Sequence, residues 1–150
     1  MKYEEFITQV QRRADLGSRK EEERATRATL ETLAERLAGG EAKDLAAQLP
    51  HELAAYLQQP LAGIGESLSL AEFFQRVSQR EGVALPEASY HTWVIIALLS
   101  EVVTMGEIEN VKAQLPADFR QLFEVENEGQ VPGQGVIDTP VIDEEDVQPL

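Results

Sequence analysis

Hydrophobic residues recur along most of the chain with the spacing of amphipathic helices. The i, i+3, i+4, i+7 pattern occurs twice, at Tyr3, Phe6, Ile7 and Val10 and again at Leu70, Phe73, Phe74 and Val77. This spacing puts the apolar side chains on one face of a helix, so both stretches are predicted to be helical. The second stretch follows Ser69, which stands three residues before Glu72 as in the capping box of a helix N-terminus.

A longer helix is predicted after each of these two. Another capping box, from Ser18 to Glu21, opens a helix that we expect to end at the glycine pair 39–40. The corresponding helix of the second region is expected to begin near Pro86, because proline is favoured in a first turn, and to end near Gly106. The longest apolar run of the chain, residues 93–99, falls inside this helix.

Short helices complete the pattern. We expect a third helix over residues 41–48 and a fourth that opens at Pro50, whose missing N–H is harmless in a first turn. Together these signals predict about eight helices and no convincing strand before residue 124. The predicted fold class is therefore all-α.

The sequence also contains an internal repeat. At an offset of 66 residues, positions 26–57 match positions 92–123 with nine identities, where about two are expected from average composition. The identities include two glutamate positions, 35/101 and 41/107, and the block Ala-Gln-Leu-Pro. We therefore predict a duplicated domain over residues 1–123, with two four-helix repeats, 3–57 and 69–123, a linker at 58–68 and a pseudo-twofold axis.

Four blocks of this domain resemble a known bacterial family. They are YEEFITQVQRRADL, EEERATRATLETLAERLAGGEAKDLAAQLP, SLAEFFQRVSQREGV and GEIENVKAQLPADFRQLF, in this order. The sequence is similar to the family named domain of unknown function 2267 over essentially residues 1–123. The resemblance implies a duplicated helical domain of bacteria and assigns no catalytic residue to this chain.

Charge is concentrated in the C-terminal segment, which lies outside the resemblance. The formal net charge is −14, and residues 124–150 hold eight acidic residues and no basic one. Prolines, glycines and the lack of a helical period predict a disordered acidic tail. The apolar run at 93–99 is far shorter than the ~20 residues of a spanning helix. With no cysteine in the chain and a charged, amphipathic start, we expect a cytoplasmic protein that does not bind membranes.

One region of the domain is locally basic. Its basic residues are Arg12, Arg13, Arg19, Lys20, Arg24 and Arg27. Acidic residues at 15 and 21–23 alternate with them, which argues against nucleic-acid binding and favours a solvated, salt-bridged surface. A sharper hypothesis is that the tail, residues 143–146 in particular, transiently occupies this surface and competes with an acidic partner.

Few residues in the sequence offer chemistry. Glu35 and Glu101 stand in otherwise apolar stretches of the long helices and could form an acid/base or di-metal pair across the pseudo-twofold axis. We favour a structural role, in which each accepts bonds from N–H groups at the start of a short helix. His51 and His91 lack a second ligand at metal-binding spacing and are expected at the surface or its boundary. We predict no enzyme, metal or cofactor.

Two functions fit these features. The first is a non-catalytic protein-interaction or regulatory module, which self-associates or binds an unknown protein through exposed apolar residues. The alternative is a carrier or sensor of a small apolar ligand held between the two repeats. The residues expected to line that ligand site are Trp93, Ile96, Leu99, Phe6 and Leu33.

Overall fold

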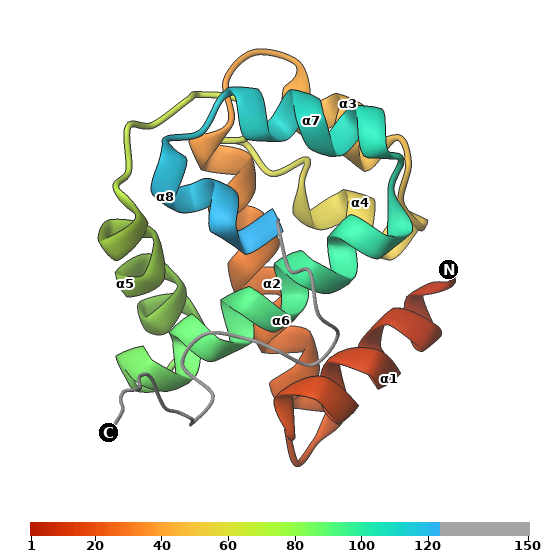
Figure 1. Cartoon of the computed structure of the whole chain (residues 1–150). Coiled ribbons are helices and arrows are strands. Elements are labelled where there is room, and N and C mark those ends of the chain that lie inside the picture. Colours follow the sequence, from red (N-terminus) through yellow and green to blue (C-terminus); the bar gives the residue numbers. More distant parts are fainter. Residues whose placement is uncertain (124–150) are drawn as a thin grey trace, which may run out of the picture.

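A computed structural model of the chain describes residues 1–123, and these form eight α-helices and a final 3₁₀ turn without any strand (Figure 1). The helices are α1 (Tyr3–Ala14), α2 (Arg19–Arg36), α3 (Glu41–Ala46), α4 (His51–Tyr56), α5 (Leu70–Glu81), α6 (Leu85–Val102), α7 (Met105–Ala113) and α8 (Ala117–Arg120), and the 3₁₀ turn η1 is Gln121–Phe123. The predicted all-α class is confirmed. The predicted acidic tail lies outside the described residues.

The long helices α2 and α6 form the centre of the molecule and contact each other. Helix α1 packs against both of them, and so does α5. The short helices α3 and α7 lie side by side at the top of Figure 1, and the α1–α2 and α5–α6 turns lie at its lower end. We call residues 3–57 the first half and residues 69–123 the second half. The first helix of each half thus packs against the long helix of the other half.

Helix α6 supplies much of the hydrophobic core. Its sequence is apolar almost all round, and residues on every side of it are buried, including Ile95, Ile96 and Leu98. Phe73 and Phe119 pack edge to face within the same core, with ring centres 5.5 Å apart. Across residues 1–123, no single helix is long and apolar enough to cross a membrane. Helices α5 and α6, which are bent by 101° relative to each other, would together be long and apolar enough by length and composition alone.

Both predicted cap residues are present at their helices, but only Ser69 forms a complete capping box, because the Glu21 carboxylate accepts the Gly17 N–H at 2.9 Å and not that of Ser18. Ser18 Oγ accepts the Glu21 N–H at 3.2 Å, and Ser69 Oγ accepts the Glu72 N–H at 3.1 Å. The Glu72 side chain in turn accepts the Ser69 N–H at 2.9 Å. These bonds satisfy N–H groups that have no partner within the helix, so the sequence fixes both starting points locally.

Four predicted boundaries are wrong by a few residues, and one of them is the end of α2, which lies at Arg36 and not at the glycine pair 39–40. Helix α6 ends at Val102 and not near Gly106, because Thr104 caps a new helix by accepting the Glu107 N–H at 3.2 Å. Gly106 therefore lies in the first turn of α7. Helix α3 ends two residues before the predicted 48, and Pro50 is the residue that precedes α4, not part of its first turn.

The repeated Ala-Gln-Leu-Pro blocks connect the two halves through their glutamines. Gln48 Oε1 accepts the Thr104 N–H at 2.8 Å, and its Nε2 donates to Thr104 Oγ1 at 3.2 Å. Gln114 binds Ala38 in the same way: Oε1 accepts the Ala38 N–H at 2.8 Å and Nε2 donates to the Ala38 carbonyl at 3.3 Å. Each glutamine therefore holds the chain just after the long helix of the other half.

The linker at 58–68 is docked on the end of α2. The Gly63 N–H donates to the Ala34 carbonyl at 2.9 Å, and the Gly39 N–H donates to the Gly63 carbonyl at 3.1 Å. Gly63 has a φ of +86°, and a Cβ there would lie 2.7 Å from the Gly39 oxygen. Only glycine fits this close backbone approach.

Candidate functional site

A pocket of about 500 Å³ lies between the α1–α2 turn and the α5–α6 turn. Both turns reverse the chain through a residue in the left-handed region, Asp15 at φ 56° and Gly82 at φ 77°. The lining residues are positions 14–16, 21 and 24 from the first half and 81–83, 87, 90 and 91 from the second. All but position 91 form pairs that are 66 or 67 residues apart. The pocket is thus built from corresponding parts of the two halves.

A buried histidine–glutamate pair lines this pocket. Glu81 is the last residue of α5, His91 lies in the second turn of α6, and their side chains are 2% and 6% exposed. His91 Nδ1 lies 2.5 Å from Glu81 Oε2. An ionised carboxylate only accepts hydrogen bonds, so beside an ionised Glu81 the His91 Nδ1 atom is the donor. Glu81 Oε1 is buried and has no hydrogen-bond partner among residues 1–123.

The expectation that His91 lies at the surface or its boundary is therefore wrong, whereas His51 is exposed as expected. Sequence reasoning missed the pair because its members are ten residues apart and face each other only after the reversal at Gly82. In the first half, the corresponding positions are the buried alanines Ala14 and Ala25. Two alanines thus fill this place in one half, so the helix pair does not need a charged group there.

The rim of the pocket carries several charges. Asp15, Glu21 and Glu87 are exposed acids, and the exposed Arg24 donates to the Glu81 carbonyl at 3.3 Å. The Tyr90 hydroxyl donates to the Arg13 carbonyl in the last turn of α1 at 2.5 Å. Burial and, after it, the nearby charge of Asp15 raise the pKa of Tyr90. Acidic groups therefore outnumber basic ones around this opening.

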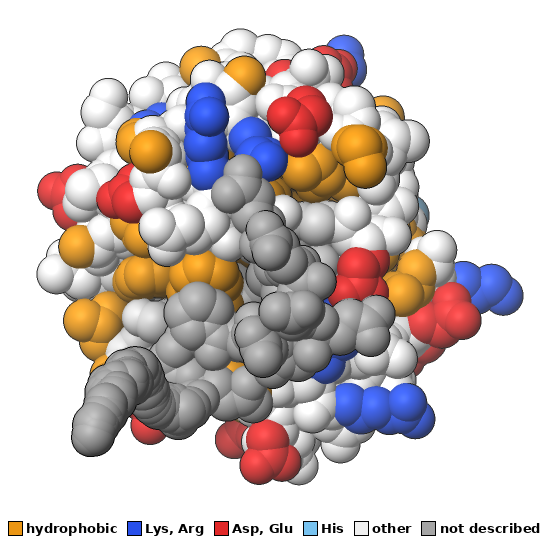
Figure 2. All heavy atoms as spheres, in the orientation of Figure 1, with side chains coloured by type: hydrophobic (Ala, Val, Ile, Leu, Met, Phe, Trp, Pro, Cys, Tyr) orange, Lys and Arg blue, Asp and Glu red, His pale blue; other side chains and the backbone are white. Residues whose placement is uncertain are grey.

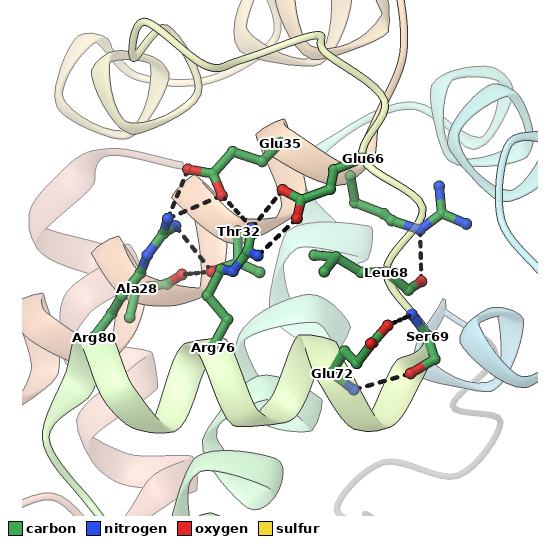
Figure 3. A network of polar contacts seen from close by, with 10 residues as sticks. Ala28, Thr32, Glu35, Glu66, Leu68, Ser69, Glu72, Arg76 and Arg80 are labelled. Atoms are coloured by element: carbon green, nitrogen blue, oxygen red, sulfur yellow. Dashed lines mark hydrogen bonds and ion pairs between the residues drawn. The ribbon is translucent and has the colours of Figure 1, made fainter.

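Glu35, one of the two predicted acids, lies in a separate network of ion pairs between α2 and α5 (Figure 3). Arg80 Nη2 donates to both of its oxygens at 2.9 and 2.8 Å, and Arg76 Nη1 donates to Oε1 at 2.9 Å. Arg76 also holds Glu66 in the linker at 2.6 and 2.8 Å. These bonds lower the pKa of Glu66 and raise that of Arg76. The Glu35 carboxylate is thus saturated by two guanidinium groups.

Glu101, the other predicted acid, lies in an exposed ion pair with Arg13 of α1, at 2.7 and 3.0 Å. Glu35 and Glu101 therefore bind arginines on different helices and do not form a pair with each other. The expected role as acceptors for N–H groups of a short helix is also wrong, because guanidinium groups occupy both carboxylates. Arg13 and Arg80, which bind them, are 67 positions apart.

The repeat-related acids that do meet are Glu41 and Glu107, in the first turns of α3 and α7. Burial, followed by a hydrogen bond from one carboxyl to the other, raises the pKa of Glu107 to about 8. The identity of positions 41 and 107 was visible in the sequence. The packing of α3 on α7, which brings the two residues together, could not be predicted from the sequence. Neither described pocket includes this pair.

The five residues expected to hold an apolar ligand all belong to the hydrophobic core. They are Phe6, Leu33, Trp93, Ile96 and Leu99, and none is more than 7% exposed. The pocket between the turns and a second one, near the start of α1, are lined by other residues. Apolar ligand binding at these five positions stays a prediction.

Most of the predicted basic surface is engaged within the domain. Arg13 pairs with Glu101, Arg27 with Glu31 at 2.8 Å, and Arg19 with Glu4 at 2.7 Å. Arg24 binds a carbonyl, as described above, while Arg12 and Lys20 are exposed. Figure 2 likewise shows basic and acidic side chains next to one another on the visible face. The proposed tail contact through residues 143–146 lies outside the described residues.

The described part of the chain contains no group of three histidine or acidic side chains placed to hold a metal ion. A comparison with curated proteins found no match. Residues 3–122 match a family described as "Uncharacterized conserved protein (DUF2267)". This match spans the helical domain from α1 to η1, in agreement with the resemblance of the four sequence blocks. The chain therefore belongs to the DUF2267 family.

Proposed function

We propose that this protein is a non-catalytic binding module, formed by two copies of a four-helix unit, which recognises its ligand or partner in the pocket between the α1–α2 and α5–α6 turns. The observation that carries the proposal is the Glu81–His91 pair. Burial of charged or polar groups costs free energy unless they are fully bonded. The first half has Ala14 and Ala25 at the corresponding positions, so packing of the helices does not require a charged pair. We therefore attribute the Glu81–His91 pair to ligand recognition.

The duplication is supported by contacts that recur between the halves. Gln48 and Gln114 each bind the other half at positions 66 apart. The pairs Arg80–Glu35 and Arg13–Glu101 also join corresponding residues. Duplication gives the two sides of such a pocket similar residues at first. Selectivity for one ligand then arises at the positions where the two halves have come to differ. Among the differences here are those at 14 and 81 and at 25 and 91, where the second half has the buried glutamate and histidine.

A catalytic role for Glu35 and Glu101 has less support. The Glu35 oxygens accept three bonds from two arginines, which leaves little capacity for a metal or a substrate. Glu101 lies in an exposed ion pair on another helix. We therefore place the function in binding, as a module that regulates or recruits a partner, and not in a chemical step.

The test is a binding screen with a variant that copies one half onto the other. In the double variant Glu81→Ala, His91→Ala, the pocket carries alanine at both places, as the first half does, so we expect the fold to persist. Amide NMR spectra of the full chain are recorded with a library of cationic, anionic and neutral fragments. We expect shifts at the α1–α2 and α5–α6 turns that vanish in the double variant.

Two results would contradict the proposed function. One is that no fragment of any charge shifts the amides of the two turns. The other is that fragments bind equally well to the double variant, since the pair would then have no part in recognition. Thermal unfolding followed by circular dichroism shows whether the double variant is folded. Thr8→Ala, an exposed change on α1 away from the turns, serves as the control.

A further inference from the structure

On the basis of the binding function proposed above, we propose that the pocket recognises a cationic nitrogen group, either a guanidinium or an alkylammonium. Such a group occurs on small amines and on the arginine and lysine side chains of proteins. The proposal rests on the charge of the pocket and on one buried acceptor atom, Glu81 Oε1, that has no donor among the described residues.

The charge of the pocket favours a cation. Asp15, Glu21, Glu81 and Glu87 line it, against Arg24 and His91. The lining is therefore negative whether or not the imidazole is protonated. A concave site lined by one sign of charge concentrates ligands of the opposite sign. Charge alone does not make a site, so the buried atoms matter more.

One atom of the buried pair lacks a hydrogen-bond donor. Glu81 Oε1 is buried without a partner among the described residues. The other carboxylate oxygen, Oε2, is already paired with His91 Nδ1. A buried carboxylate oxygen without a partner is unfavourable, and a donor from a ligand would remove this cost. An ammonium or guanidinium supplies several N–H donors and no acceptor, and it can bind directly or through one water.

An anion fits the same residues less well. Arg24 and a protonated His91 could hold a carboxylate or phosphate. However, the Arg24 guanidinium is directed to the Glu81 carbonyl, and three exposed carboxylates would repel the anion. Arg24 is instead the internal competitor of a cationic ligand, because it places a positive charge at the same opening.

The experiment uses small probes and the full chain. Methylguanidinium and butylammonium are compared with butanol, acetate and inorganic phosphate, and binding is measured from amide shifts at residues 15–17 and 82–84. We expect only the two cations to bind, weakly, as probes of so few atoms do. Their affinity should fall as sodium chloride is raised from 20 to 200 mM.

Charge variants locate the binding. Glu87→Gln, at the exposed rim, should lower the affinity for the cations about threefold, because it removes a nearby negative charge. Arg24→Gln should raise this affinity by about the same factor, because it removes a nearby positive charge. Glu109→Gln removes an equal charge from an exposed position of α7 and should leave the affinity for the cations unchanged. Unchanged affinity in both Glu87→Gln and Arg24→Gln would overturn the proposal, and neither variant replaces a side chain of the buried pair.

The remaining outcomes separate this inference from the binding function. If acetate or phosphate shifts the turn amides and the cations do not, the inference is wrong while the binding function stands. If no probe binds, both are wrong. A blocked tripeptide, acetyl-Gly-Arg-Gly-amide, identifies the source of the cation. Binding tighter than that of methylguanidinium indicates a protein side chain, and weaker binding indicates a free amine.

Discussion

Glu107 lies beside Glu41 between the first turns of α3 and α7, although both side chains are acids. One oxygen of each is buried and has no partner among residues 1–123 if both groups are ionised. A proton on Glu107 supplies the missing donor, and the negative charges of Glu41 and Asp44 oppose its loss. The pKa of Glu107 accordingly rises from its usual 4.5 to about 8. The contact between α3 and α7 thus depends on pH.

The sign of this dependence follows from proton linkage. The folded protein holds the Glu107 proton up to about pH 8, whereas the unfolded chain releases it near pH 4.5. The free energy of unfolding should therefore fall as the pH rises from 5 to 9. Because each pKa unit corresponds to about 1.4 kcal/mol, we expect Glu107 to contribute a decline on the order of 2 kcal/mol or more, measurable by urea unfolding.

The variant Glu107→Gln should remove most of this decline, because its amide donates to Glu41 at every pH. At pH 9 the variant should be more stable than the original protein. Glu109→Gln is the control on the same helix, since its side chain is 64% exposed. Equal pH slopes for Glu107→Gln and Glu109→Gln would mean that the Glu107 proton has no part in stability.

The two ion pairs of the long helices should differ in their effect on stability. The Glu35 side chain is 7% exposed, whereas that of Glu101 is 47% exposed. Glu35→Gln should lower the free energy of unfolding by about 2 kcal/mol, because two arginines lose a buried partner. Glu101→Gln should change it by less than about 1 kcal/mol. Urea unfolding at pH 7 compares them, and similar losses would show that burial of Glu35 adds nothing.

The glutamines of the Ala-Gln-Leu-Pro blocks should stabilise the contact between the halves. Gln48→Ala and Gln114→Ala each remove two hydrogen bonds to the other half. We expect each to lower the free energy of unfolding by about 1 kcal/mol. The control is Gln11→Ala, an exposed change on α1. If all three variants unfold at the same urea concentration, these bonds make no net contribution.

Two glycines should respond to alanine in opposite directions. At Gly63 the positive φ and the approach to the Gly39 oxygen leave no room for a Cβ, so Gly63→Ala should destabilise by at least about 2 kcal/mol. At Gly106, within α7, a Cβ would meet nothing within 4 Å. Gly106→Ala should therefore stabilise by about 0.5–1 kcal/mol through helix propensity. Thermal unfolding measures both, and a neutral Gly63→Ala would mean that the linker can rearrange.

Most of the secondary structure could be predicted from local signals in the sequence. Ser18 and Ser69 marked two helix starts because a capping bond joins residues only three apart. The predicted helix end near Gly106 was wrong because Thr104 caps a new helix there. Glycine is a common signal for a helix end, so the capping threonine was overlooked. Errors of this kind are small, since they concern the choice between neighbouring residues.

The choice of interacting acids could not be made in the same way. The sequence offered two repeat-related pairs, at 35/101 and at 41/107, and hydrophobic context favoured the first. The structure brings the second pair together, because α3 packs on α7 while α2 and α6 direct their acids to arginines of α5 and α1. Which of two similar pairs meets depends on the packing of helices that are far apart in the chain.

The sequence by itself determined the helices, their order and the internal repeat, because periodicity, caps and turn residues act over a few positions. Only the tertiary structure decided that Glu81 and His91 are buried together beside a pocket. It also decided that burial and the neighbouring Glu41 raise the pKa of Glu107. The physical reason is that burial and proximity to another charge depend on neighbours from distant segments, and no local pattern records them.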